Sequence, residues 1–105
     1  MECKINGLKW NVFFVDKNDD KLLYDGSNNL GVTYYDDLEI YLKTDMSKPL
    51  FRQTVIHELV HAFLFSYGIH LENSDVTEEA VCDFCGAHLD KIVKLTKRVV
   101  EIWER

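Results

Sequence analysis

Two histidines and a glutamate stand at a spacing that suits the binding and use of a metal ion. They belong to the segment His57-Glu58-Leu59-Val60-His61. Residues four apart lie one turn apart on a helix face, so both imidazoles can reach one ion. Glu58 follows His57 by about 100° around such a helix, outside the ligand set but close to a metal-bound water. The sequence predicts one Zn²⁺ ion on His57 and His61, with Glu58 as general base.

A zinc ion that keeps one tetrahedral position for water needs a third protein ligand. The acidic candidates that follow are Glu72, Asp75, Glu78, Glu79 and Asp83. We favour Glu79, because Asp83 follows one turn later and can accept the outer N–H of a ligand histidine. Glu78 is the main alternative, although an acid there also suits the first turn of a helix. Asp83 as a direct ligand is the remaining choice.

This spacing resembles the gluzincin branch of zinc peptidases. In that branch an HExxH helix precedes a second helix with a ligand Glu, often followed four positions later by Asp. Glu79 and Asp83 match this spacing, but Glu78 stands where Asn is usual and Cys82 replaces a small hydroxyl residue. The resemblance implies a zinc peptidase with Glu79 as the third ligand.

Residues 57–84 resemble more closely the small metallopeptidase-like proteins of bacteriophage and prophage genomes. The shared features are the helix sequence that starts at His57 and an acidic pair followed by Val81-Cys82-x-Phe84. The chain is also reminiscent of the ImmA/IrrE group, whose members cleave or regulate transcriptional repressors. These resemblances imply a protein or peptide substrate.

Alternating strands must support the predicted metal helix. In the segment 8–15 the side chains of Leu8, Trp10, Val12 and Phe14 share one face, which indicates a half-buried strand. Residues 32–35 and 38–42 indicate a hairpin around the turn-prone pair 36–37. Its second arm, Leu38, Glu39, Ile40, Tyr41 and Leu42, is our candidate edge for an extended substrate.

Two helices follow the strands. Ser47 and Pro49 suit a helix start, and Gly68 suits its end. The intervening segment is apolar around much of its circumference, so we expect a buried central helix. A second helix starts at Asp75 or Thr77 and runs to about residue 103, with a possible break near residue 96. The predicted fold is α+β: an antiparallel sheet of about three strands packed on the HExxH helix, with the second helix crossing it.

The bulk composition narrows the function. With 105 residues, we expect a single domain, 1–105. The net charge is −6. We interpret the densest basic run as a solvated helix face that the helix dipole favours. This run consists of Lys91, Lys94, Lys97 and Arg98. We therefore expect no nucleic-acid or membrane partner. An apolar signal or spanning segment is missing, which favours a cytoplasmic protein.

Several other residues are candidates for further roles. The three cysteines argue against a closed disulfide framework, and Cys82 and Cys85 read as small buried helix residues rather than a zinc site. Candidate oxyanion donors, which the sequence does not rank, are His70, His88, Tyr34, Tyr35 and Tyr67.

Three functions remain open at this point. The preferred one is a zinc peptidase, in which zinc polarises the scissile carbonyl and Glu58 activates the water. The second is a non-catalytic protein that keeps the zinc as a structural clip and binds a host or regulatory protein. Its motivation is the small size of the chain, which leaves little room for substrate recognition. The third is a zinc hydrolase that acts on something other than a peptide.

Overall fold

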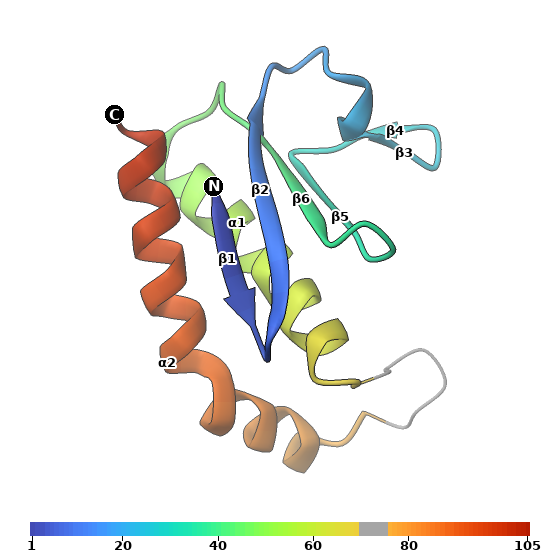
Figure 1. The fold of residues 1–105 in the computed structure, drawn as a ribbon, viewed down its shortest axis with the longest axis vertical. Coiled ribbons are helices and arrows are strands. Elements are labelled where there is room, and N and C mark those ends of the chain that lie inside the picture. The colour runs from blue at the N-terminus through green and yellow to red at the C-terminus, as the bar shows by residue number, and fades with distance from the viewer. Residues whose placement is uncertain (70–75) are drawn as a thin grey trace.

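The structure, a computed structural model, describes residues 1–69 and 76–105 and confirms the α+β fold (Figure 1). The strands are β1 (Glu2–Ile5), β2 (Leu8–Val15), β3 (Leu23–Tyr24), β4 (Ser27–Asn28), β5 (Gly31–Tyr34) and β6 (Glu39–Lys43). A 3-10 turn, η1 (Asp20–Leu22), precedes β3. The helices are α1 (Lys48–Ser66), which carries the HExxH segment, and α2 (Glu78–Trp103).

The main sheet has four strands in the order β1-β2-β6-β5. The β5–β6 hairpin is antiparallel as expected, the β1–β2 pair is also antiparallel, and β2 and β6 run parallel. After β2 the chain leaves the sheet, forms η1 and the β3–β4 hairpin, and returns at the far edge as β5 (Figure 1). The β5–β6 hairpin then places β6 beside β2 in the same direction.

The first strand, β1, is absent from our sequence prediction although the sequence carries a signal for it. Asn6 and Gly7 join β1 to β2 with φ values of 49° and 80°. Two consecutive positive φ values define a type I′ turn, for which Asn-Gly is a preferred pair. The turn pairs Ile5 with Leu8 and sets the register of the first hairpin.

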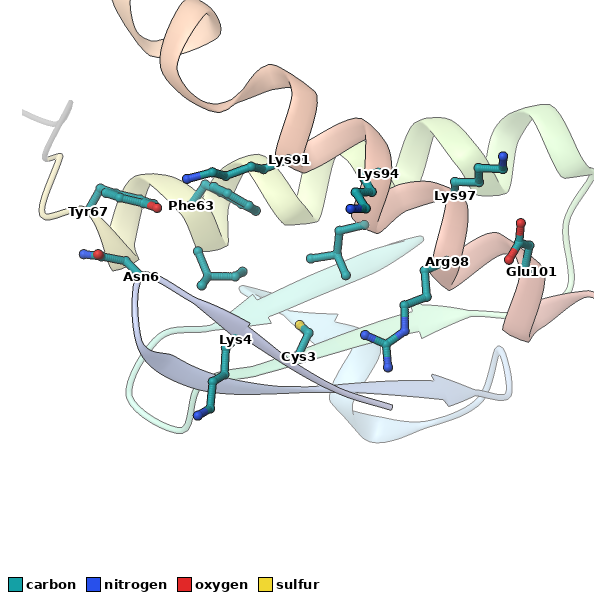
Figure 2. A pocket seen from close by; sticks show the side chains of 12 residues that line it. Cys3, Lys4, Asn6, Phe63, Tyr67, Lys91, Lys94, Lys97, Arg98 and Glu101 are labelled. Carbon is teal, nitrogen blue, oxygen red and sulfur yellow. The ribbon is translucent and has the colours of Figure 1, made fainter.

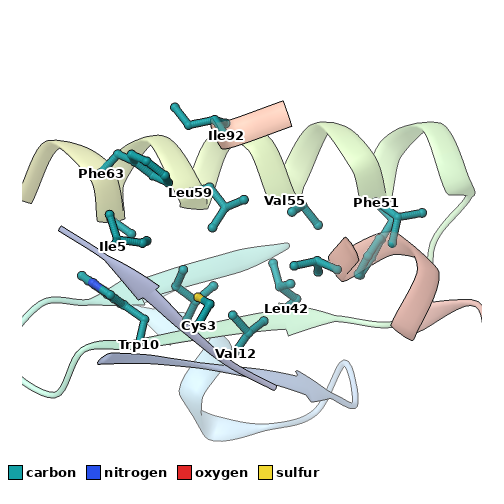
Figure 3. Packing of buried hydrophobic residues seen from close by; sticks show 14 residues of the cluster. Cys3, Ile5, Trp10, Val12, Leu42, Phe51, Val55, Leu59, Phe63 and Ile92 are labelled. Carbon is teal, nitrogen blue, oxygen red and sulfur yellow. The ribbon is translucent and has the colours of Figure 1, made fainter. Parts of the chain in front are cut away.

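The core lies between one face of the sheet and α1 (Figure 3). Trp10 and Val12 of β2 and Ile40 and Leu42 of β6 contribute to this face, as their alternation predicts. The α1 helix supplies buried side chains along its length, and α2 packs beside it through residues such as Ile92. The α1 helix is therefore the central element, in contact with the sheet and with α2.

Both helices begin and end near the predicted residues. Ser47 is the N-cap residue of α1, although its side chain makes no capping hydrogen bond, and Gly68 with φ +70° lies just past its end. The N-cap of α2 is Thr77, whose hydroxyl accepts a hydrogen bond from the Ala80 N–H at 3.1 Å. The alternative start at Asp75 lies outside the described residues. The α2 helix continues through Thr96, whose hydroxyl donates to the Ile92 carbonyl.

Candidate metal and catalytic site

The two histidines of the motif lie side by side on α1. Their ring centroids are 4.9 Å apart and the ring planes make an angle of 73°. The His57 side chain is 68 % exposed and His61 is half-buried. Helical spacing accounts for this proximity, because one turn separates the two residues. The imidazoles are thus accessible from solvent and close to each other.

Glu58, in contrast, is buried at 5 % exposure and held by the neighbouring strand. The Thr33 hydroxyl, from β5, lies 2.9 Å from Glu58 Oε1 and 3.3 Å from the Glu58 backbone carbonyl oxygen. The other carboxylate oxygen, Oε2, lies 3.9 Å from His57 Nε2. Burying a carboxylate is costly unless polar contacts compensate for it. The Thr33 hydroxyl supplies such a contact, and it holds the Glu58 carboxylate directly beside the histidine pair.

Gly31 allows β5 to approach this carboxylate closely. A Cβ atom added at Gly31 would lie 2.9 Å from Glu58 Cγ, 3.1 Å from Thr54 Cγ2 and 3.3 Å from Glu58 Cδ. Glu58 and Thr54 are both buried and cannot move aside without repacking. A glycine at this position is thus required by space rather than by backbone conformation.

We expect Gly31→Ala to destabilise the protein by about 1–3 kcal/mol through overpacking against Glu58. Gly86→Ala is the matched control, because a Cβ at this helical glycine meets no atom within 4 Å. That change should stabilise the protein by about 0.5–1 kcal/mol. Urea unfolding of both variants measures the difference. Equal stabilities would show that β5 does not lie against Glu58 as described.

Two hollows open along β5 beside these residues. They have volumes of about 210 and 260 Å³, and both are lined by Asn29, Gly31, His57 and Glu58. β5 is an edge strand of the four-stranded sheet. The Lys43 N–H donates to the Leu30 carbonyl, and ladder alternation from this bond turns the backbone N–H and C=O groups of Gly31 and Thr33 away from β6. An extended chain could pair with these groups beside the histidines.

The predicted substrate edge, residues 38–42, is wrong. β6 (Glu39–Lys43) lies inside the sheet, paired with β2 on one side and with β5 on the other. Its backbone groups are therefore engaged, and Leu38 lies in the preceding turn with φ +55°. The Tyr41 side chain, which donates to Glu39 Oε1 at 3.1 Å, is buried, and this burial raises its pKa to about 12. Alternation along β6 identifies a buried face but not a free edge.

Tyr35 contacts the second histidine of the motif. Its hydroxyl oxygen lies 3.1 Å from His61 Nδ1, and its ring stacks on Phe65 with centroids 5.1 Å apart. This contact orients the His61 ring and leaves Nε2 as its other nitrogen. We predicted such an orienting role for Asp83, whereas the described contact comes from Tyr35. The sequence offered Tyr35 only as one of several oxyanion candidates, because nothing in the spacing joins a β5–β6 turn to α1.

The third ligand is not brought to the histidines in the described part of the chain. No group of three or more His, Cys, Asp or Glu side chains suited to a metal occurs among residues 1–69 and 76–105. Glu78, Glu79 and Asp83 lie exposed on the first turns of α2. Asp83 lines an apolar cavity with Val60 of α1. The candidates Glu72 and Asp75 lie outside the described residues, as does His70.

The remaining sequence candidates have other surroundings. Cys82 is exposed and Cys85 half-buried, so the interpretation of two buried cysteines is wrong for Cys82, and both are free thiols. The His88 ring lies against the Tyr67 ring at an angle of 42°, with centroids 4.2 Å apart, and His88 Nδ1 is buried without a hydrogen-bond partner among the described residues. The hydroxyl of Tyr34 donates to the Lys21 carbonyl.

Comparisons with protein-family models, curated proteins and solved structures found no match to this chain. Among the described residues, neither helix combines the length and the apolar character that crossing a membrane requires. The functional interpretation therefore depends on the site itself.

Proposed function

We propose that this protein is a zinc-dependent peptidase whose site consists of His57, Glu58 and His61. The observation that carries the proposal is the buried Glu58 carboxylate, fixed by Thr33 with one oxygen 3.9 Å from His57 Nε2. A buried carboxylate has a cost in stability. Glu58 lies between the histidine pair and an open strand edge, which is the position of a catalytic base. A catalytic role would explain why this cost is tolerated.

The two histidines suit two of the positions around a zinc ion. Two neighbouring imidazoles are common zinc ligands, and the contact of Tyr35 with His61 Nδ1 leaves Nε2 available. Glu79 remains our prediction for the third ligand, with Glu78 as the alternative. A bound zinc would lower the pKa of a coordinated water and polarise a substrate carbonyl.

The chain's own residues have distinct roles in this proposal. Glu58 Oε2 accepts the proton of the attacking water and later gives it to the leaving amine. Thr33 holds Oε1, so that the other oxygen stays directed to the histidine side. The outward backbone groups of Gly31 and Thr33 hold the substrate extended along β5. We thus assign the substrate edge to β5.

Metal removal tests the proposal. The purified protein, loaded with zinc, should cleave members of a peptide library, detected as new peptide termini by mass spectrometry. Chelation with 1,10-phenanthroline should abolish cleavage, and added zinc should restore it, because the ion activates the water. Cleavage that continues unchanged after zinc is removed, or no cleavage by a fully zinc-loaded protein, would contradict a zinc peptidase.

A further inference from the structure

A groove lies at the edge of the sheet opposite to β5, between β1 and the C-terminal half of α2 (Figure 2). Its volume is about 710 Å³. Apolar side chains from three elements line it, among them Ile5 of β1, Phe63 of α1 and Leu95 of α2. None of the motif residues on α1 lines this groove. It is therefore separate from the proposed catalytic site.

The groove is strongly basic in an acidic protein. Five cationic residues line it against the single acid Glu101: Lys4, Lys91, Lys94, Lys97 and Arg98. The whole chain has 12 Lys and Arg residues and a net charge of −6. The Lys and Arg ion pairs among the described residues join Lys9 to Glu2 and Lys48 to Glu104. The five groove cations thus form no ion pair among the described residues.

Our sequence interpretation attributed the basic residues of α2 to the helix dipole. The dipole does not explain their clustering. The dipole acts within the last turn of a helix. The α2 helix continues to Trp103, and its last turn has no basic residue. Lys91, Lys94 and Arg98 are spaced by three and four residues and so share one helix face. Figure 2 shows the side chains of Lys94 and Arg98 on the side of α2 that borders the groove.

The other wall of the groove is a free strand edge. β1 pairs only with β2 in the described sheet. The Val12 N–H donates to the Met1 carbonyl at 2.6 Å, so ladder alternation turns the backbone N–H and C=O groups of Glu2 and Lys4 away from β2. Such an edge can accept a further strand through backbone hydrogen bonds.

We propose that this groove binds an extended acidic segment of a partner protein, which adds a strand beside β1 and directs carboxylates to α2. Alternate residues of a strand lie about 6.8 Å apart on one face. Residues three and four apart on a helix lie about 4.5 and 6 Å apart along its axis. Long Lys and Arg side chains can bridge this difference. The preferred segment therefore carries acidic residues at every second position.

Peptide binding tests this proposal without metal or activity. The probe is a fluorescein-labelled octapeptide of alternating Glu and Val, with a Gln/Val peptide as control. Fluorescence anisotropy at low salt should give at least tenfold tighter binding for the Glu peptide. The Lys94→Glu/Arg98→Glu variant should lose at least tenfold in affinity. The charge-matched control Lys17→Glu/Arg52→Glu, outside the groove, should lose much less.

A proline substitution separates strand pairing from charge attraction. Glu2→Pro removes an outward N–H together with a negative charge, at the first residue of an edge strand, where proline is tolerated. Charge alone predicts tighter binding of the acidic peptide, whereas strand pairing predicts weaker binding. Tighter binding by Glu2→Pro, or equal losses in the two charge-reversal variants, would overturn the proposal.

Two other occupants of the groove would also overturn it. Tighter binding of a single-stranded oligonucleotide of equal charge than of the peptide would indicate a nucleic-acid site. Dimerisation in sedimentation velocity that Lys94→Glu/Arg98→Glu abolishes would indicate a second copy of this chain. The proposal does not depend on the peptidase assignment, because each of these measurements is made on protein without zinc.

Discussion

Replacing Glu58 by Gln is expected to lower the rate of peptide hydrolysis by a factor of about 10² to 10⁴. The amide has nearly the same shape, and its oxygen can still accept the hydrogen bond from Thr33. It cannot take a proton from water, so the variant loses the general base alone. Zinc binding should persist, because Glu58 is not among the proposed ligands.

Glu39→Gln is the matched control for this loss. Glu39 is half-buried on β6 and accepts a hydrogen bond from Tyr41, but it does not line either hollow beside the histidines. The Glu39→Gln variant should hydrolyse peptides at a rate within a factor of about 3 of the wild type. Such a factor corresponds to a change of ~0.6 kcal/mol in the activation barrier. If Glu58→Gln works normally in a biological assay, the chain is a zinc-bound binder rather than a peptidase.

The largest effect on stability is expected at Trp10. This residue is fully buried between the sheet and the end of α1. Its indole N–H donates to Ser66 Oγ at 2.9 Å, and its ring meets Phe65 edge to face. Trp10→Ala should lower the free energy of unfolding by about 3–5 kcal/mol, because it leaves a cavity and an unpaired hydroxyl. That loss is a large part of the about 5–15 kcal/mol typical of a domain.

Phe13→Ala provides the comparison on the same strand. Phe13 lies on the opposite face of β2, is 38 % exposed and stacks on Tyr41. Phe13→Ala should lower the free energy of unfolding by half as much as Trp10→Ala or less, because less apolar area returns to water. Urea unfolding, with Trp10→Phe as a milder variant if the alanine protein fails to fold, measures both effects. A loss below about 1 kcal/mol for Trp10→Ala would contradict the described packing.

The local pattern of the sequence was sufficient for the longer elements of the fold, although it left β1 unpredicted. The alternation of Trp10 and Val12 identified the buried face of β2, and Pro49 and Gly68 bounded α1 closely. The helical period also placed His57 beside His61 without any tertiary information. These features depend on neighbours within a few residues, which a sequence displays directly.

Long-range pairing was not predictable in the same way. Residues 39–42 show a buried face, but only the path of the chain through β5 decides that β6 is an inner strand. The contact of Tyr35 with His61 joins residues 26 positions apart. Likewise, Gly31 is explained only by the side chains of Glu58 and Thr54 that lie against it. Strand order and close approach arise from the whole chain rather than from any window of it.

The zinc content of the chain tests the central claim most directly. After equilibrium dialysis against zinc, elemental mass spectrometry should give one ion per wild-type chain and none in the His57→Asn/His61→Asn variant. The Cys82→Ser/Cys85→Ser variant should keep its ion, which excludes the Cys-x-x-Cys pair as the site. Glu79→Ala should bind zinc more weakly than Glu78→Ala. Zinc that survives loss of both histidines would contradict the proposed metal site.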